Sequence, residues 1–149
     1  MLRLLKPDAQ AAFKRYRADL NAAGIEVRLT ETMRSSAKQA DLFREGTKTA
    51  NKVSWHQLGR AWHEIIIDPN TGKLDIAAKC LDLWRQRAKL AEKHGIRQLG
   101  FNADGTVRYI KTPKGKAFDP YHLEFRGKHP TLVAAVEAEA PELKSLFTS

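Results

Sequence analysis

Three of the five histidines of this chain lie in two short segments, one of which also carries an acidic residue. His56 and His63 fall within residues 54–63, and His122 follows Asp119 in the second segment. Neutral imidazole is a common zinc ligand, and a catalytic zinc site typically combines three protein ligands with one open position. A carboxylate beside that position can accept a proton from water. The two segments therefore contain the residue types needed for metal-assisted hydrolysis.

Chain geometry decides whether these side chains can meet. His56 and His63 are seven positions apart, so they would face opposite ways on one strand and lie two turns apart on one helix. Gly59 permits a turn that would bring His63 back beside His56. Asp119 and His122 can point the same way in a tight turn. Each histidine could also be an ordinary surface or core residue, so the hypothesis depends on all four residues acting together.

The elements that must position these residues can be predicted from local patterns. Pro7 and Gly24 suit the start and end of a first helix, residues 26–30 alternate as a strand does, and Ser36 to Gln39 has the form of a capping box. We predict helices over 7–23, 36–45, 74–94 and 130–140, strands over 26–30, 61–67 and 121–125, a loop over 46–52, and a hairpin or long loop over 100–116. This order predicts an α+β fold in which helices pack around a small antiparallel sheet, with the metal site at the sheet.

The composition suits one globular domain spanning residues 1–149. No apolar run is long enough to span a bilayer, and the N-terminus does not resemble a secretory signal, so we expect synthesis in the cytoplasm. Cys80 is the single cysteine, which excludes an intrachain disulfide, and we expect it to be buried within the 74–94 helix. The net charge of +9 favours a polyanionic partner such as nucleic acid, a membrane surface or a bacterial envelope, or it marks a solvated surface.

Three short motifs resemble those of the zinc D-alanyl-D-alanine carboxypeptidases and dipeptidases, a family that includes phage endolysins cutting the L-alanyl-D-glutamate bond of peptidoglycan. The residues that match are Arg34, Ser35 and Gln39, then Ser54, His56, Gly59 and Ala61, then Asp119, His122, Leu123 and Glu124. The likeness extends from about Pro7 to Phe125. It implies a single peptidase-like catalytic domain that holds Zn²⁺.

The resemblance also implies a role for each matched residue. His56 and His122 would be zinc ligands, and Asp119 would be the general base. Arg34 would steady the substrate carbonyl or carboxylate. The pocket would be lined by Gln39 and Ser54.

One position departs from the family pattern. Where the family has aspartate, this chain has His63. His63 could be the third ligand, which we favour because an all-histidine zinc site is chemically sound. Alternatively Glu64 or Asp68 could replace the missing acid, although Glu64 should face the other side of the strand, or the site could be impaired. In addition, residues 95–101 lack the Trp-Gly-Gly-like run that is common in the family.

These observations lead to three functional expectations. The first is a monomeric zinc peptidase cutting an L-Ala-D-Glu or D-Ala-containing bond of peptidoglycan stem peptides, as a phage-type lysin that reaches the anionic envelope after release. The second is an impaired module of the same fold that binds the wall or a virion. The third is a basic nucleic-acid-binding protein, but the chain has no recognised DNA-reading motif, so we expect no nucleic-acid partner.

Overall fold

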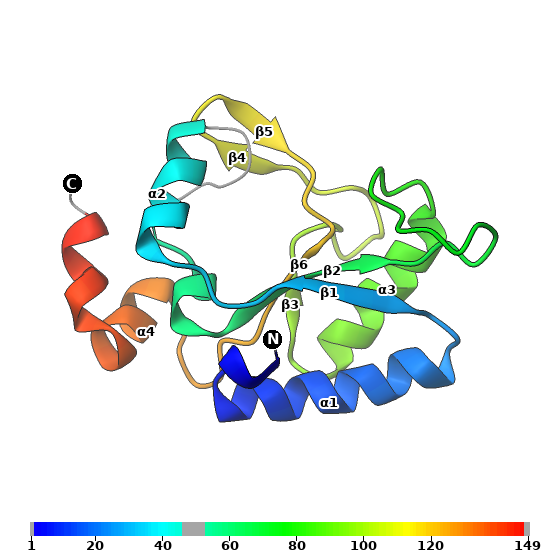
Figure 1. Cartoon of the computed structure of the whole chain (residues 1–149), viewed down its shortest axis with the longest axis horizontal. Helices are drawn as coiled ribbons and strands as arrows, with labels where there is room; N and C mark the ends of the chain where they lie inside the picture. Colours follow the sequence, from blue (N-terminus) through cyan, green and yellow to red (C-terminus); the bar gives the residue numbers. More distant parts are fainter. Residues whose placement is uncertain (1, 46–52, 148–149) are drawn as a thin grey trace.

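The computed structural model describes residues 2–45 and 53–147, so the predicted loop at 46–52 lies outside the described residues. Four strands form an antiparallel sheet in the order β1-β2-β6-β3, and β4 and β5 form a separate hairpin (Figure 1). The elements in chain order are η1 (Leu2–Leu4), α1 (Pro7–Ala22), β1 (Val27–Glu31), α2 (Ser36–Glu45), η2 (Trp55–Leu58), β2 (Ala61–Ile66), α3 (Leu81–Lys93), β3 (Arg97–Gln98), β4 (Ile110–Thr112), β5 (Gly115–Ala117), β6 (His122–Glu124), α4 (Leu132–Glu139) and η3 (Pro141–Phe147).

One face of the sheet forms the main hydrophobic core against α1 and α3. Trp62 on β2 and Leu123 on β6 are paired in register and fully buried. Trp62 packs edge-to-face against Phe13 of α1, with 5.4 Å between ring centroids. Successive side chains of a strand point to opposite faces, so the neighbours of Trp62 and Leu123 project to the other face of the sheet.

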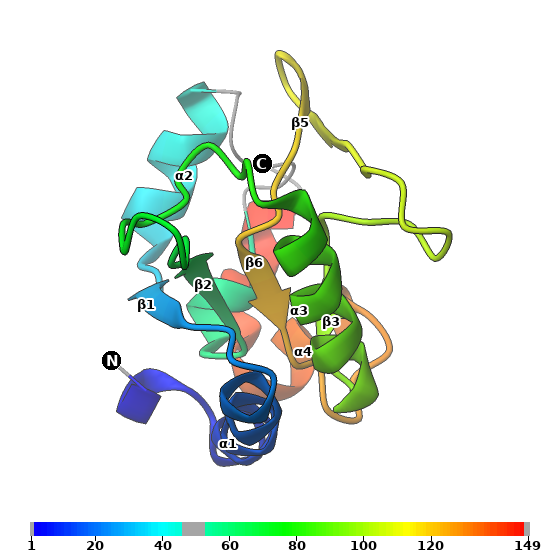
Figure 2. The same ribbon diagram turned by 90° about the vertical axis from the view of Figure 1, so that its right-hand side faces the viewer.

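The second face is flanked by α2 and by the β4–β5 hairpin, which extend from the side of the sheet away from α1 (Figures 1 and 2). A second apolar cluster joins η2 to the C-terminal helices α4 and η3. Its buried members are Val53, Trp55, Leu58, Ala61, Ala135, Val136 and Ala140. The C-terminal segment therefore supports η2, the short helix that carries His56.

The predicted α+β class and antiparallel sheet are confirmed, but the 74–94 helix was predicted too long. It begins at Leu81, because the Asp75 carboxylate accepts hydrogen bonds from the backbone N–H of Lys79 (2.9 Å) and Cys80 (2.8 Å) and from Trp84 Nε1 (2.8 Å). These contacts hold residues 75–80 in a turned, non-helical path. Cys80 is therefore the half-buried residue that precedes α3, and not a buried residue within a helix.

The bounds predicted for α2 are confirmed, but its capping residue and the start of α4 differ from the prediction. Ser35, and not Ser36, caps α2, because its hydroxyl accepts from the Lys38 N–H at 3.1 Å. Thr131 caps α4 by accepting from the Ala134 N–H at 3.1 Å, so this helix begins two residues after Pro130. Among the described helices, none combines the length and apolar character needed to cross a membrane.

Candidate metal centre

A turn at Gly59 brings the first two histidines together. Gly59 adopts the left-handed conformation (φ 67°) that ends η2, and its N–H donates to the His56 carbonyl at 3.2 Å. A β-carbon at this position would lie 2.7 Å from the Leu4 carbonyl oxygen, so glycine is required by contact as well as by conformation. After the turn, the His56 and His63 rings lie 4.6 Å apart. The geometry that Gly59 predicts from the sequence is therefore present.

The pairing of β2 with β6 brings in the third histidine. His63 and His122 are direct cross-strand partners, and their rings lie 5.4 Å apart. One potential ligand atom from each of His56, His63 and His122 lies within 4.8 Å of the other two. His63 Nε2 and His122 Nδ1 are 3.3 Å apart. A tetrahedral zinc with Zn–N distances near 2.0–2.1 Å needs its nitrogen ligands about 3.3 Å apart.

The ring nitrogens that do not face this cluster have hydrogen-bond partners that set the tautomers. His56 Nδ1 lies 2.6 Å from the Thr32 carbonyl and donates to it, while its buried Nε2 has no partner among the described residues. His122 Nε2 donates to Glu124 Oε1 at 3.0 Å, which leaves Nδ1 available. A carbonyl or carboxylate on the outer nitrogen is the usual way in which proteins orient metal-binding histidines. The donor set therefore fits a zinc ion.

Burial and neighbouring charges keep two of the imidazoles, those of His56 and His63, neutral, as metal ligation requires. Burial, followed by the proximity of His122, lowers the pKa of His56 to about 3. Burial, together with His56 and His122, also lowers the pKa of His63 well below its usual value. Both rings can thus accept a cation without first losing a proton near neutral pH.

Asp119 lies at the open side of the cluster, as predicted for a base. Its Oδ1 accepts from the His122 N–H at 3.2 Å, and its Oδ2 is 4.0 Å from His63 Nε2. Burial raises the pKa of the Asp119 carboxyl, although His122 acts in the opposite direction. A general acid–base catalyst works best when its pKa lies near the working pH, so a raised pKa suits Asp119 to this role near neutral pH.

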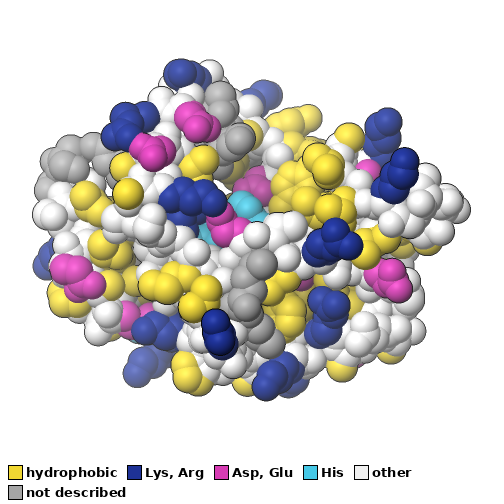
Figure 3. Space-filling model, in the orientation of Figure 1, with side chains coloured by type: hydrophobic (Ala, Val, Ile, Leu, Met, Phe, Trp, Pro, Cys, Tyr) yellow, Lys and Arg dark blue, Asp and Glu magenta, His cyan; other side chains and the backbone are white. Residues whose placement is uncertain are grey.

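The histidines form the floor of a pocket of about 280 Å³. Figure 3 shows them at the bottom of a hollow, beside acidic side chains. Ser54 lines this pocket, as predicted, and Arg34, expected to steady the substrate, lies on its lining as well. Gln39 was predicted to line the pocket, but it is not among the lining residues. It is fully buried, and its Oε1 accepts a hydrogen bond from Arg34 NH1 at 2.5 Å, so it orients the Arg34 guanidinium. Apolar lining comes from Val53, Trp55, Leu99, Ile110 and Leu132.

Two charged lining residues, Glu124 and Arg126, were given no role by the sequence analysis. Glu124 follows His122 by two positions on β6, and that spacing alone places both side chains on one face. Burial opposes ionisation of Glu124, but hydrogen bonds from His122 and Arg126 outweigh it and hold the pKa below its usual value. Arg126 lies over the Trp55 ring at 4.9 Å and donates to Glu124 at 2.5 Å. No sequence pattern indicated this stack.

Glu31 was also missed, because its position depends on strand pairing. Its carboxylate accepts from Arg34 Nε at 3.0 Å and from Lys38 Nζ at 2.6 Å. Burial raises the pKa of Glu31, but the hydrogen bonds from Lys38 and Arg34 outweigh it, and the pKa is below its usual value.

The alternative acids to His63 lie elsewhere. Glu64 is fully buried on the core face, where Tyr16 donates to it and Arg87 Nε donates at 2.9 Å. Asp68 accepts from the Asn70 N–H at 2.8 Å in the turn after β2. The expectation that Glu64 faces away from position 63 is confirmed, and neither acid belongs to the group of three histidines.

Arg87 forms hydrogen bonds with both chain segments that carry site residues, the turn before β6 and strand β2. NH1 donates to the Pro120 carbonyl at 2.5 Å, and NH2 donates to the Tyr121 carbonyl at 3.2 Å. The same guanidinium binds Glu64, the neighbour of His63. One buried side chain therefore supports the turn that carries Asp119 and the strand that carries His63.

No protein-family model matches the sequence, and no curated protein sequence matches it either. Solved structures do match. The Serratia marcescens L-Ala D-Glu endopeptidase ChiX aligns with a TM-score of 0.59 at 19% identity, over 83% of this chain and 82% of that one. The LD-carboxypeptidase LdcB aligns with a TM-score of 0.58 at 19% identity, over 97% and 68%. VanYB, solved in complex with D-alanine-D-alanine, aligns with a TM-score of 0.54 at 14% identity, over 93% and 78%. The resemblance inferred from the motifs is thus confirmed at the level of the fold: the chain shares the fold of L-Ala-D-Glu endopeptidases and LD-carboxypeptidases.

Proposed function

We propose that the chain is a zinc-dependent peptidase that hydrolyses the peptide stems of peptidoglycan, at an L-Ala-D-Glu or D-Ala-containing bond. The observation that carries the proposal is the convergence of three imidazoles at the floor of a pocket beside the Asp119 carboxylate. The basic surface of the chain suits an anionic bacterial envelope. We further propose that it acts as a phage-type lysin and folds as one catalytic domain.

In this proposal His56, His63 and His122 would hold the zinc through the nitrogens that face the cluster. Zinc supplies Lewis-acid polarisation and makes water more acidic at neutral pH. Asp119 takes the proton from the attacking water and passes it to the leaving amine. Arg34, held by Glu31 and Gln39, stabilises the negative charge that develops on the scissile carbonyl oxygen.

The test is hydrolysis of purified peptidoglycan and of synthetic stem peptides, with the released ends identified by mass spectrometry. We expect activity that is lost on chelation, restored by zinc, and reduced by at least about 100-fold in Asp119→Ala. Asp104→Asn, an exposed loop variant, is the matched control and should remain active. Undiminished activity after complete zinc removal, or in Asp119→Ala, would refute the mechanism. The identity of the new ends distinguishes an endopeptidase from a carboxypeptidase.

A second candidate function follows from His63, because an all-imidazole set gives the centre no anionic ligand. The chain would then be a wall- or virion-binding module with an impaired centre. Peptidoglycan pull-down without release of peptides would support this alternative. Turnover that appears only in His63→Asp would show that the centre lacks a single ligand.

A further inference from the structure

A β-bulge brings Glu31 to the metal-binding face of the sheet. Leu29 pairs with Glu64 and packs against the core, so regular pairing would place Thr30 opposite His63 and turn Glu31 toward the core. The register instead shifts between Leu29 and Glu31, and Glu31 lies opposite His63. A bulge of this kind re-aims a side chain and is often found beside active sites.

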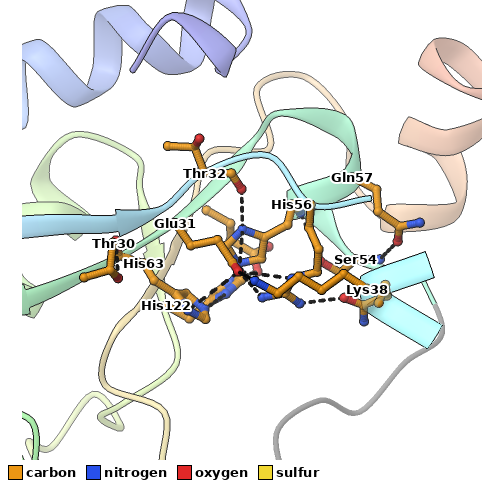
Figure 4. A network of polar contacts seen from close by, with 12 residues as sticks. Thr30, Glu31, Thr32, Lys38, Ser54, His56, Gln57, His63 and His122 are labelled. Carbon is orange, nitrogen blue, oxygen red and sulfur yellow. Dashed lines mark hydrogen bonds and ion pairs between the residues drawn. The ribbon is translucent and has the colours of Figure 1, made fainter. Parts of the chain in front are cut away.

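The result is a carboxylate that lies beside the rings of His56 and His63 (Figure 4). Glu31 Oε1 is 3.8 Å from His56 Nδ1 and 4.0 Å from His63 Nδ1. Its other oxygen, Oε2, binds Lys38. The carboxylate is not one of the grouped ligand atoms, so it can act on the centre without entering the coordination shell.

A carboxylate at this position would affect an all-histidine centre in two ways, through its charge and through the His63 tautomer. Three neutral imidazoles bring no negative charge to a dication, and an anion beside two of the rings supplies it. An anion near His63 Nδ1 also favours a proton on that nitrogen, which leaves Nε2 free. His63 Nε2 is the atom that lies 3.3 Å from His122 Nδ1, the spacing that suits two ligands of one zinc.

We propose that Glu31 is a positioning residue of the centre. It supplies the negative charge that an aspartate at position 63 would bring, and it favours the His63 tautomer whose Nε2 is free to face His122. The inference rests on the proposed function in one respect, namely that the histidines bind zinc. It assigns Glu31 no contact with substrate.

The test is the zinc dissociation constant of the whole chain, measured by competition with a chromophoric chelator at neutral pH. Glu31→Gln should weaken zinc binding roughly 10- to 100-fold, the usual effect of removing a carboxylate that orients a ligand. Lys38→Met breaks the same ion pair from the other end, so it should leave binding unchanged or make it tighter. Glu26→Gln, an exposed change at the start of β1, should have no effect.

Two further variants separate an electrostatic role from a structural one. Glu31→Asp keeps the charge and should bind zinc more tightly than Glu31→Gln. His63→Asp introduces a negatively charged ligand. In that background Glu31→Gln should weaken zinc binding by a smaller factor than it does in the natural chain. Far-UV circular dichroism and thermal melts of the metal-free variants monitor folding.

The proposal is overturned if Glu31→Gln binds zinc as tightly as the natural chain, or if Glu31→Asp and Glu31→Gln are equally weak. A loss from Lys38→Met as large as that from Glu31→Gln would likewise overturn it. Failure of the natural chain to bind zinc at all would instead refute the proposed function, so the two failures are distinguishable.

Discussion

The buried ion pair between Arg87 and Glu64 should be costly to break from one side. Both side chains are almost fully buried, and Arg87 Nε donates to Glu64 Oε1 at 2.9 Å. Arg87 also satisfies the carbonyls of Pro120 and Tyr121. Arg87→Met would leave a buried carboxylate without its cation and would remove one donor from each of the two carbonyls, although Tyr121 would keep the hydrogen bond from the Glu64 N–H.

The magnitude follows from this arrangement. Removing one partner of a buried ion pair costs about 3–5 kcal/mol of unfolding free energy. For a chain of this length each kcal/mol corresponds to about 2–4 °C in Tm, so Arg87→Met should melt roughly 6–20 °C lower. Replacing both partners, as in Arg87→Met with Glu64→Leu, removes the unpaired charge and should recover most of the loss.

The assay is urea unfolding of the metal-free protein followed by far-UV circular dichroism, arranged as a double-mutant cycle. Arg85→Met is the matched control, because Arg85 is on the same helix and pairs with the exposed Asp82, an ion pair worth at most about 1 kcal/mol. Arg85 also donates to the Gly105 carbonyl at 2.8 Å, but its removal leaves no buried charge without a partner. The reasoning fails if Arg87→Met costs no more than Arg85→Met. It also fails if the double variant is no more stable than Arg87→Met alone.

Three other predictions concern the turn, the histidines and the pocket. Gly24 and Gly59 both have positive φ, but only at Gly59 would a β-carbon meet a backbone oxygen, at 2.7 Å. Gly24→Ala should cost about 1–2 kcal/mol of unfolding free energy, and Gly59→Ala should cost more. Equal losses in urea unfolding would contradict this. The metal-free protein should lose stability as the pH falls below about 6.5. His56 and His63 have lowered pKa values in the folded chain, so they take up protons in the unfolded chain at a higher pH than in the folded one. Thermal melts across pH should show a weaker dependence of Tm on pH in the double variant that combines His56→Gln and His63→Gln. Arg126 lines the pocket, and we expect its guanidinium to bind a carboxylate of the anionic stem peptide. Arg126→Ala should then raise KM by roughly tenfold with little change in kcat, the cost of one charge-assisted hydrogen bond. Steady-state kinetics showing an unchanged KM would exclude that contact.

Much of the architecture could be predicted from local pattern. Proline and glycine mark the ends of α1, alternation marks β1, and Gly59 between two histidines indicates the turn that brings them together. These features depend on the conformational preferences of a few neighbouring residues, which the chain carries wherever it folds. The motifs around Arg34, His56 and His122 likewise pointed to the fold that the structural comparisons show.

Other features depend on contacts between distant segments. The start of α3 was predicted too early, because the hydrogen bonds of Asp75 compete with helix formation in a way that periodicity does not reveal. Gln39 was expected in the pocket, but packing turned it to hold Arg34.

The residue order alone indicated the turn that brings His56 and His63 together, because the conformational freedom of Gly59 is a local property. The pairing of β2 with β6, which the tertiary structure decides, brings His122 beside them. The tertiary structure alone decided which ring nitrogens face the centre and which carboxylate stands beside it. His56 Nδ1 is oriented by the Thr32 carbonyl, and Glu31 reaches the histidines through a register shift between β1 and β2. Register and hydrogen-bond partners are set when separate strands pair, and a one-residue slip would turn Glu31 to the opposite face of the sheet.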